Sequence, residues 1–411
     1  MKRAVILAAA LLTAVVSQSA HAEQLKIAMI EALSGPAAQT GIAFTEGVRY
    51  GVSKLNVAGG FNGEPIRLLE YDNQGGPSDA AEKLKAAIAE GARIVSSASS
   101  SAVAAQLSED IRKYNLRNPG KEIIYYNVGS EAYDLTASRC HFWFFRMSTN
   151  PYIRIRALVR AMKDSGVLGT KVYSINQNYS YGTDHEKAQA QYVAEAGATI
   201  VGSVLHDTNK IQDFSPYVEK IRASGAETVL TGNWANDIIM LLKAIGDAGL
   251  KVRIGNTSLD TPGTLGNAGH VALGAYLVKI YNLEAGGAAG KDFINDFKAE
   301  IGHYPISEEP TSAFAIGFLG KALKAVDFKS GIDAKALALA LENTKYETPI
   351  GPWSVRREDH QLILPITVSE VSLDAAYKAD NTDMGFKLVR VVSAEDAETP
   401  PSPACKMQRP K

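Results

Sequence analysis

The sequence contains little cysteine and no excess of charge of either sign. Its 411 residues include two cysteines, too few for a disulfide scaffold or a zinc-ribbon array. The 43 basic and 44 acidic side chains give a formal charge of −1, whereas a nucleic-acid-binding protein carries a basic excess or a basic stripe. We therefore expect no nucleic-acid partner.

Short motifs for catalysis and for metal or cofactor binding are also absent. The chain has no GxGxxG after an expected strand, no GxxxxGK[ST], no HExxH, no CxxC and no GxSxG. None of its seven histidines lies at a ligand-like spacing from another. We expect no metal, no cofactor and no enzymatic activity; an α/β enzyme with an unrecognised site is the alternative.

Long apolar runs are rare, and the one at the N-terminus has the features of an export signal. Residues 1–3 are Met-Lys-Arg, residues 4–16 are an apolar run, and Ala20-His21-Ala22 has the small-x-small pattern that signal peptidase cuts. An apolar run of this length is shorter than the ~20 residues that span a bilayer. We predict a cleaved signal peptide over residues 1–22 and a mature start near Glu23.

From residue 25 onward, short apolar strands alternate with amphipathic helices. Strands are expected at 25–30, 66–72, 94–97 and 122–127, and again at 171–176, 199–206, 227–231 and 252–255, with helices between them. Strands separated by helices of this length form right-handed βαβ units and parallel sheets. The sequence predicts an α/β protein with two doubly wound parallel-sheet lobes.

The order of elements changes after residue 274, so we expect the chain to cross between the lobes more than once. Strand-like pieces return at 363–371 and 386–392, after helices at 291–301, 311–326 and 333–341. We predict that lobe 1 comprises residues 23–146 and 279–348, that lobe 2 comprises 147–278 and 349–392, and that 393–411 is a tail.

Three polar or aromatic loops directly follow expected strands, at the edge where open α/β sheets bind ligands. The serine-rich turn 96–101 precedes a helix, whose first amides and dipole favour an anion such as a carboxylate. The loops 178–182 (NYSYG) and 232–236 (GNWAN) carry aromatic side chains that can cover a ligand. Each loop is equally compatible with an ordinary turn that binds nothing.

The N-terminal hundred residues resemble the periplasmic leucine/isoleucine/valine-binding protein family. The resemblance rests on SGPAAQTG at 34–41, EGVRYGVSKLN at 46–56 and AGGFNGEPIRLLEYDNQGGPSDAAEK at 58–83. It continues through the serine-rich turn, the Tyr181 and Trp234 loops and the 313–322 helix. It implies a type I periplasmic binding fold with a three-segment hinge, serving the membrane permease of an ABC importer from the periplasm.

The resemblance also implies roles for individual residues. Ser99, beside Ser100, matches the hydroxyl that binds the ligand carboxylate; Tyr181 and Trp234 match ligand-facing aromatics; Thr40 matches a residue that borders the pocket. The family's threonine near the carboxylate is replaced by Ser130 and Glu131, and its glutamate for the α-ammonium has no counterpart before Asp260. The ammonium partner is therefore Glu131 or Asp260, or the ligand is a carboxylate without an amine, such as an aromatic acid.

The leading functional hypothesis is an exported, monomeric solute-binding protein that closes around a small carboxylate-bearing ligand, a branched-chain or other hydrophobic amino acid. A ligand-sensing regulator of the same fold is a further alternative, but such regulators usually lack an export signal. In an exported protein, Cys140 and Cys405 are expected to form a structural disulfide. The alternative is two unrelated thiols.

Overall fold

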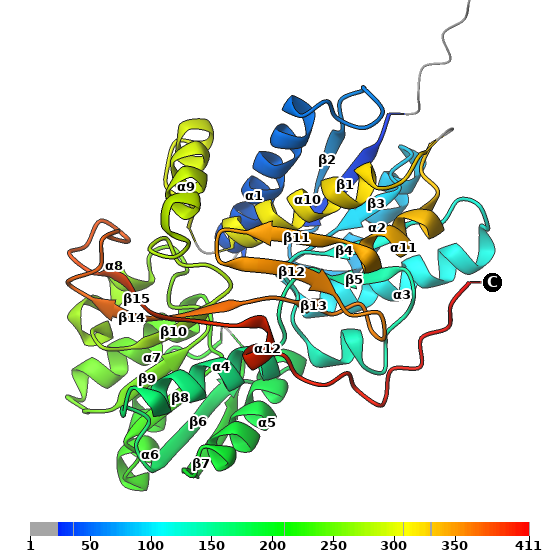
Figure 1. Ribbon diagram of the computed structural model, residues 1–411. Helices are drawn as coiled ribbons and strands as arrows, with labels where there is room; N and C mark the ends of the chain where they lie inside the picture. The colour runs from blue at the N-terminus through cyan, green and yellow to red at the C-terminus, as the bar shows by residue number, and fades with distance from the viewer. Residues whose placement is uncertain (1–23, 36, 209, 307, 329–330, 411) are drawn as a thin grey trace, which may run out of the picture.

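The predicted alternation of strands and helices folds into two α/β lobes (Figure 1). The computed structural model describes residues 24–410 apart from positions 36, 209, 307, 329 and 330. The predicted signal peptide and its cleavage point lie outside the described residues. Within the described part of the chain, no helix combines the length and the apolar character needed to cross a membrane.

Lobe 1 is built on a five-stranded sheet in the order β2-β1-β3-β4-β5, in which every pair is parallel. Helices α2 and α3 pack on one face, and α1, α10 and α11 pack on the other. Apolar residues on both sides of the strands explain why the sheet is buried on both faces. The strands are Lys26–Glu31, Arg67–Asp72, Ile94–Ser96, Ile124–Asn127 and Phe144–Arg146; the helices are Ala38–Val57, Pro77–Ala89, Ser101–Arg117, Glu309–Lys324 and Ala334–Asn343, with α9 at Gly287–Ile301 beside α1.

Lobe 2 is built on a seven-stranded sheet in the order β15-β14-β10-β9-β8-β6-β7. Strand β14 runs antiparallel to both of its neighbours, β10 and β15, and every other neighbouring pair is parallel. Helices α4 and α5 cover one face, and α6, α7 and α8 cover the other. The strands are Lys171–Gln177, Thr199–His206, Thr228–Thr231, Arg253–Asn256, Tyr276–Lys279, Ile366–Ser372 and Gly385–Val392; the helices are Pro151–Asp164, Ser180–Glu195, Ser215–Ser224, Asn236–Asp247 and Thr264–Ala268.

A small antiparallel sheet shifts one predicted lobe boundary. Strands β11 (Lys345–Thr348), β12 (Gly351–Val355) and β13 (Leu362–Ile363) pair with one another, and the fully buried Trp353 lies in the core of lobe 1. The chain enters lobe 2 at β14 rather than at residue 349, because Trp353, Leu362 and Leu364 bury their apolar surface against lobe 1. Pro365 separates β13 from β14, which the sequence had suggested to be one strand over 363–371.

Three segments cross between the lobes, as expected for a three-segment hinge. The chain passes from lobe 1 to lobe 2 after β5, returns after β10, and passes again between β13 and β14 (Figure 1). The first and third crossings lie side by side, since Arg146 pairs with Gln361 in an isolated parallel bridge. Phe142, Phe144 and Phe145, which precede or begin the first crossing strand, are buried in lobe 1, Trp143 beside them is half-buried, and none of the four lines the pocket between the lobes.

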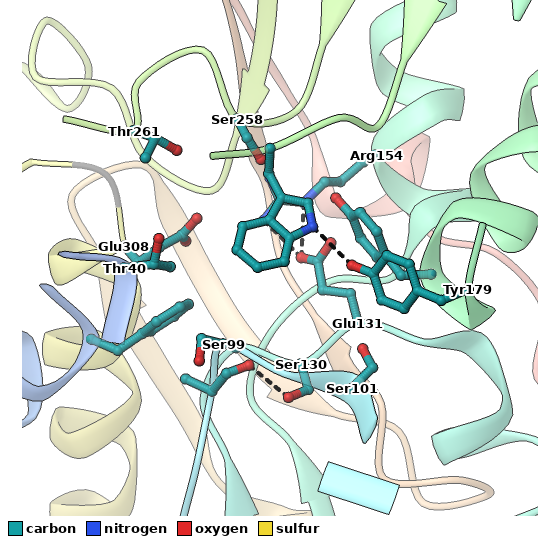
Figure 2. A pocket seen from close by; sticks show the side chains of 15 residues that line it. Thr40, Ser99, Ser101, Ser130, Glu131, Arg154, Tyr179, Ser258, Thr261 and Glu308 are labelled. Carbon is teal, nitrogen blue, oxygen red and sulfur yellow. Dashed lines mark hydrogen bonds and ion pairs between the residues drawn. The ribbon is translucent and has the colours of Figure 1, made fainter. Parts of the chain in front are cut away.

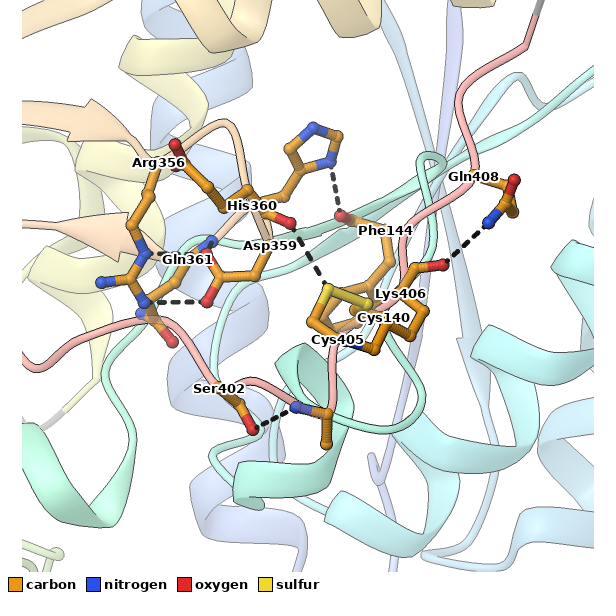
Figure 3. The surroundings of a disulfide bond; sticks show 12 residues. Cys140, Phe144, Arg356, Asp359, His360, Gln361, Ser402, Cys405, Lys406 and Gln408 are labelled. Carbon is orange, nitrogen blue, oxygen red and sulfur yellow. Dashed lines mark hydrogen bonds and ion pairs between the residues drawn. A yellow bond between two sulfur atoms is a disulfide. The ribbon is translucent and has the colours of Figure 1, made fainter.

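The C-terminal tail crosses the hinge a further time. After the short helix α12 (Ala394–Ala397) beside α4, it runs back to lobe 1, where Arg409 lies 2.6 Å from Glu342 of α11 (Figure 1). Cys405 forms a disulfide with Cys140, with the two Cα atoms 5.5 Å apart, which confirms the predicted bridge (Figure 3). The tail therefore connects lobe 2 covalently to the segment just before β5.

Candidate functional site

A pocket of about 60 Å³ lies between the lobes, at the carboxyl ends of the strands (Figure 2). Each lobe contributes one wall, so the pocket exists only while the lobes are close together. Figure 2 shows Ser99, Ser101 and Ser130 on one side and Ser258 and Thr261 on the opposite side. The lining residues are Thr40, Phe44, Ala98, Ser99, Ser101, Gly129, Ser130, Glu131, Arg154, Tyr179, Tyr181, Trp234, Ser258, Thr261 and Glu308.

Six of the eight ligand-binding residues expected from the sequence line this pocket together. Thr40, Ser99, Ser130 and Glu131 come from lobe 1, and Tyr181 and Trp234 come from lobe 2. Ser100 does not line it; its hydroxyl caps α3 by accepting a hydrogen bond from Val103 N at 3.4 Å. Asp260 lies outside this lining and borders a second, larger cavity.

The serine-rich turn is organised by a buried carboxylate that belongs to the protein itself. Glu31, at the end of β1, accepts hydrogen bonds from Ala98 N at 2.6 Å, from Ser99 N at 3.0 Å and from the Ser99 hydroxyl. Burial raises the pKa of Glu31, and these hydrogen bonds oppose the shift. The amides and the hydroxyl that were expected to bind a ligand carboxylate at this turn therefore already donate hydrogen bonds to Glu31.

The orientation of the hydroxyl groups determines what they offer to a ligand. Ser99 donates to Glu31 and Ser130 donates to Ala98 O at 2.6 Å, so both present oxygen lone pairs toward the pocket. Ser101 instead accepts from Ala132 N at 3.2 Å, which leaves its own proton available. Ser101 is also the first residue of α3, where the helix dipole favours a negative charge.

A buried ion pair forms the floor of the pocket. Arg154 Nη2 lies 2.7 Å from Glu131 Oε1, and both side chains are almost inaccessible to solvent. The hydrogen bonds that described residues donate to this carboxylate, from Ser148, Thr149 and Arg154, all go to Oε1. Glu131 Oε2 is therefore the oxygen that remains for a ligand donor.

A second buried cluster sits at the edge of the pocket, where β10 leaves lobe 2. Lys279 forms ion pairs with Asp260, at 3.1 Å, and with Glu308. Burial raises the pKa of Asp260, whereas Lys279 holds the pKa of Glu308 below its ordinary value. Because Glu131 lines the pocket and Asp260 lies outside its lining, Asp260 is a poorer candidate than Glu131 for a ligand ammonium. Of the three residues of this cluster only Glu308 lines the pocket, so with Glu131 and Arg154 the lining holds two carboxylates and one cation.

The aromatic wall comes from two loops of lobe 2. Trp234 Nε1 donates to the Tyr179 hydroxyl at 2.9 Å, and the Tyr181 hydroxyl lies 3.0 Å from Thr257 Oγ1. Ala235, which follows Trp234 in the chain, has φ of +53°, a strained conformation. It turns the chain between β8 and α7. The indole is thus held by a hydrogen bond and by its backbone before any ligand arrives.

Close backbone packing shapes the opposite wall. A Cβ atom on Gly129 would lie 2.5 Å from the Phe44 ring and 2.7 Å from Ala98 Cβ, so only glycine allows this approach. Sequence reasoning missed Arg154 and Glu308, which lie on no recognisable motif. Ser101 and Tyr179 belong to the two loops that the sequence had singled out, so position in those loops was the signal for them.

Comparison with known proteins shows the family to which this chain belongs. Residues 24–378 match the family model described as "Periplasmic binding protein". The chain belongs to the periplasmic binding protein family. It is 50% identical over 392 residues to the Leu/Ile/Val-binding protein homolog 4 of Brucella melitensis biotype 1, an alignment that covers 95% of this chain and 94% of the relative. The family assignment makes the chain a solute-binding protein and implies a periplasmic location.

Solved structures show the same architecture. The Brucella ovis leucine-, isoleucine-, valine-, threonine- and alanine-binding protein, crystallised in a closed conformation, has a TM-score of 0.92 and 49% identity, covering 95% of this chain and 100% of that one. A Rhodopseudomonas palustris solute-binding protein in complex with benzoate has a TM-score of 0.74 and 20% identity, over 90% of this chain and 98% of that one. At 20% identity, the similarity to the Rhodopseudomonas palustris protein shows a shared fold only.

Proposed function

We propose that this protein is the exported, monomeric solute-binding subunit of an ABC importer and that it captures an aliphatic amino acid as a zwitterion. The observation that carries the proposal is the charge and polarity of the pocket. The pocket lining holds two carboxylates, Glu131 and Glu308, and one cation, Arg154. Glu131 Oε2 is open to a donor, and Ser99 and Ser130 offer lone pairs. Such a site favours a ligand that brings a positive group.

The two charged ends of an amino acid would then bind to different parts of the site. The α-ammonium would donate to Glu131 Oε2 and to the oriented hydroxyls, since hydrogen bonds between charged groups are the strong ones. The carboxylate would accept from the Ser101 hydroxyl at the start of α3 and from the Tyr179 hydroxyl, whose oxygen already accepts from Trp234. Phe44 and Trp234 would enclose the side chain.

Transport requires that the closed state be favoured only with ligand present. The ligand would bridge hydroxyls and acids on lobe 1 with aromatics on lobe 2, so its binding energy is available only when the hinge is shut. A closed, loaded form is what a membrane permease can distinguish from the empty protein.

An amino-acid ligand is supported by the names of two relatives at about half identity. A simple aromatic acid, the alternative, is supported by the missing counterpart of the family's glutamate and by neighbours that share the fold at about one fifth identity. A benzoate-like anion would add a further negative charge to the cleft and leave Glu131 Oε2 without a donor. We therefore prefer the amino acid.

Ligand analogues test this without altering the protein. Isothermal titration calorimetry would compare leucine with 4-methylpentanoate, which lacks the amine, with leucinamide, which lacks the carboxylate, and with benzoate. Because hydrogen bonds to charged groups are worth roughly 1.5–3 kcal/mol, each leucine analogue should bind about ten- to a hundredfold more weakly than leucine. Tighter binding of benzoate or 4-methylpentanoate than of leucine would contradict the proposal.

A further inference from the structure

Three side chains outside the cleft converge on one side of lobe 1. Glu46 lies in α1, His303 follows α9, and Glu309 is the first residue of α10. Their ligand-type atoms all lie within 4.8 Å of one another. The neighbouring Gly47 explains the convergence: a Cβ there would lie 2.3 Å from Glu309 O, so the glycine lets α1 and α10 approach closely.

The carboxylate of Glu309 is completely buried and only half satisfied. Its Oε2 accepts a hydrogen bond from Ile306 N at 2.7 Å. Its Oε1 receives no hydrogen bond from any described residue, although the side chain is 0% exposed. A buried carboxylate oxygen without a donor is costly, and this one points toward His303 and Glu46.

The imidazole of His303 is oriented as a ligand. Its Nδ1 lies 2.9 Å from Tyr304 O, and a carbonyl can only accept, so Nδ1 carries the proton. In the neutral ring, Nε2 then holds a lone pair, and it lies 3.8 Å from an oxygen of Glu46 and 3.8 Å from Glu309 Oε1. A hydrogen bond from the second ring nitrogen to a carbonyl is the usual way in which a metal-binding histidine is held.

We propose that Glu46, His303 and Glu309 form a binding site for a first-row divalent cation, with Zn²⁺ as the best fit. Imidazole and carboxylate are ligands that Zn²⁺ accepts at about 2.0–2.2 Å, which puts neighbouring tetrahedral ligands roughly 3.3 Å apart. The present nitrogen–oxygen separations exceed that by about half an ångström. Small side-chain movements of the partly exposed Glu46 and His303 would close the difference.

This site is independent of amino-acid binding, and its fourth position is open to water because His303 is 43% exposed. The competing account is that a proton, not a metal, holds the cluster together. Burial and the nearby Glu46 raise the pKa of Glu309 to about 9, so a protonated carboxyl could bridge the two glutamates. In that case the cluster would take up no cation.

Metal uptake by the intact, tag-free protein distinguishes the two accounts. The chelator-treated protein would be equilibrated with Zn²⁺ and its metal content measured, and Co²⁺ would serve as a visible probe of coordination. We expect one Zn²⁺ per chain and Co²⁺ absorption of four-coordinate intensity. Glu46→Gln and His303→Gln should each weaken Zn²⁺ binding by at least about tenfold.

His270→Gln is the matched control, because His270 is also an exposed imidazole beside a carboxylate, Asp383, but lacks a third ligand. It should leave Zn²⁺ binding unchanged. Failure of the unaltered protein to retain Zn²⁺ would overturn the proposal. Equal binding by the His303→Gln variant would overturn it as well, and leucine titrations of the same samples would show that each variant is folded.

Discussion

At the scale of single residues, Glu31 determines what the serine-rich turn can do. Its carboxylate accepts the hydrogen bonds that Ala98 and Ser99 can donate. The donor that remains for an anionic ligand at this turn is the Ser101 hydroxyl, at the start of α3. A family motif correctly located this turn in the cleft. It did not reveal that a residue 68 positions away in sequence already satisfies the Ser99 hydroxyl.

Alanine substitutions of the two serines should therefore have different effects. Ser101→Ala should lower ligand affinity about tenfold or more, because a hydrogen bond to a charged carboxylate is worth roughly 1.5–3 kcal/mol. Ser99→Ala should act mainly on stability, with a loss of about 1–3 kcal/mol, because Glu31 loses a buried donor. Calorimetry with leucine and urea unfolding would be run on both variants; equal affinity losses would contradict this division.

A second residue-scale prediction concerns His185, which packs beneath Tyr181. Neither of its ring nitrogens has a hydrogen-bond partner among the described residues, and burial lowers its pKa to about 3. Unfolded histidine titrates near pH 6.5. As the pH falls below that value, only the unfolded state binds the proton, so the free energy of unfolding falls by about 1.4 kcal/mol per pH unit from this group.

His185→Phe should weaken that dependence. Urea unfolding at pH 7 and pH 5 should show a smaller loss of stability in the variant than in the unaltered protein. Some loss will persist, because burial also lowers the pKa of His141, to about 4. An identical loss in both proteins would mean that His185 is protonated, or solvated, in the native state.

Residues of the site could be predicted only where the chain carries a local signal. The expected loops contained Ser101 and Tyr179, since strand-end loops of parallel sheets meet at one edge. Arg154 gave no such signal: it sits in α4 among buried apolar residues and finds Glu131 only through the docking of the lobes. Glu308 likewise faces Lys279 because β10 ends beside it, a long-range contact.

At the scale of elements, the spacing of apolar residues and the turn residues between them predicted most strands of both large sheets and the helices that cover them. The antiparallel strands β11 and β12 escaped because they are short and carry Pro352 and an isolated Trp353 rather than an alternating pattern. Their place is decided by burial of that indole in lobe 1. For the tail, the sequence predicted the disulfide of Cys405 but none of the other contacts, because those contacts depend on tertiary packing.

The disulfide should stabilise the protein substantially. It joins residues 265 positions apart, and the chain-entropy model gives about 6 kcal/mol for closing so long a loop. The Cys140→Ser/Cys405→Ser double variant should unfold at lower urea concentration, with a loss of about 2–5 kcal/mol. Thiol titration of the unreduced parent protein is the control and should detect no free thiol; unchanged stability of the variant would show that the tail's other contacts suffice.

At the scale of the whole molecule, the tail is attached to both moving bodies. On lobe 2, Arg160 pairs with Asp396 of α12 at 2.8 Å. On lobe 1, the disulfide is reinforced by Arg409, which lies 2.6 Å from Glu342. Between them, Arg356 holds Glu398 at 3.2 Å beside the third crossing segment. A hinge motion that separates the lobes must therefore extend the tail or detach one of its ends.

The tail should consequently limit how far the empty protein opens. In the Cys140→Ser/Cys405→Ser variant, small-angle scattering of the ligand-free protein should give a larger radius of gyration than in the parent. The leucine-saturated forms should have the same radius, because closure by ligand does not stretch the tail. A wider open state also lowers the fraction of molecules near closure, so apparent affinity should fall in proportion to that fraction.

Arg409→Ala, which removes an ion pair but keeps the covalent link, is the matched control and should open no further than the parent. Equal ligand-free radii in all three proteins would show that the hinge itself, and not the tail, sets the range of opening.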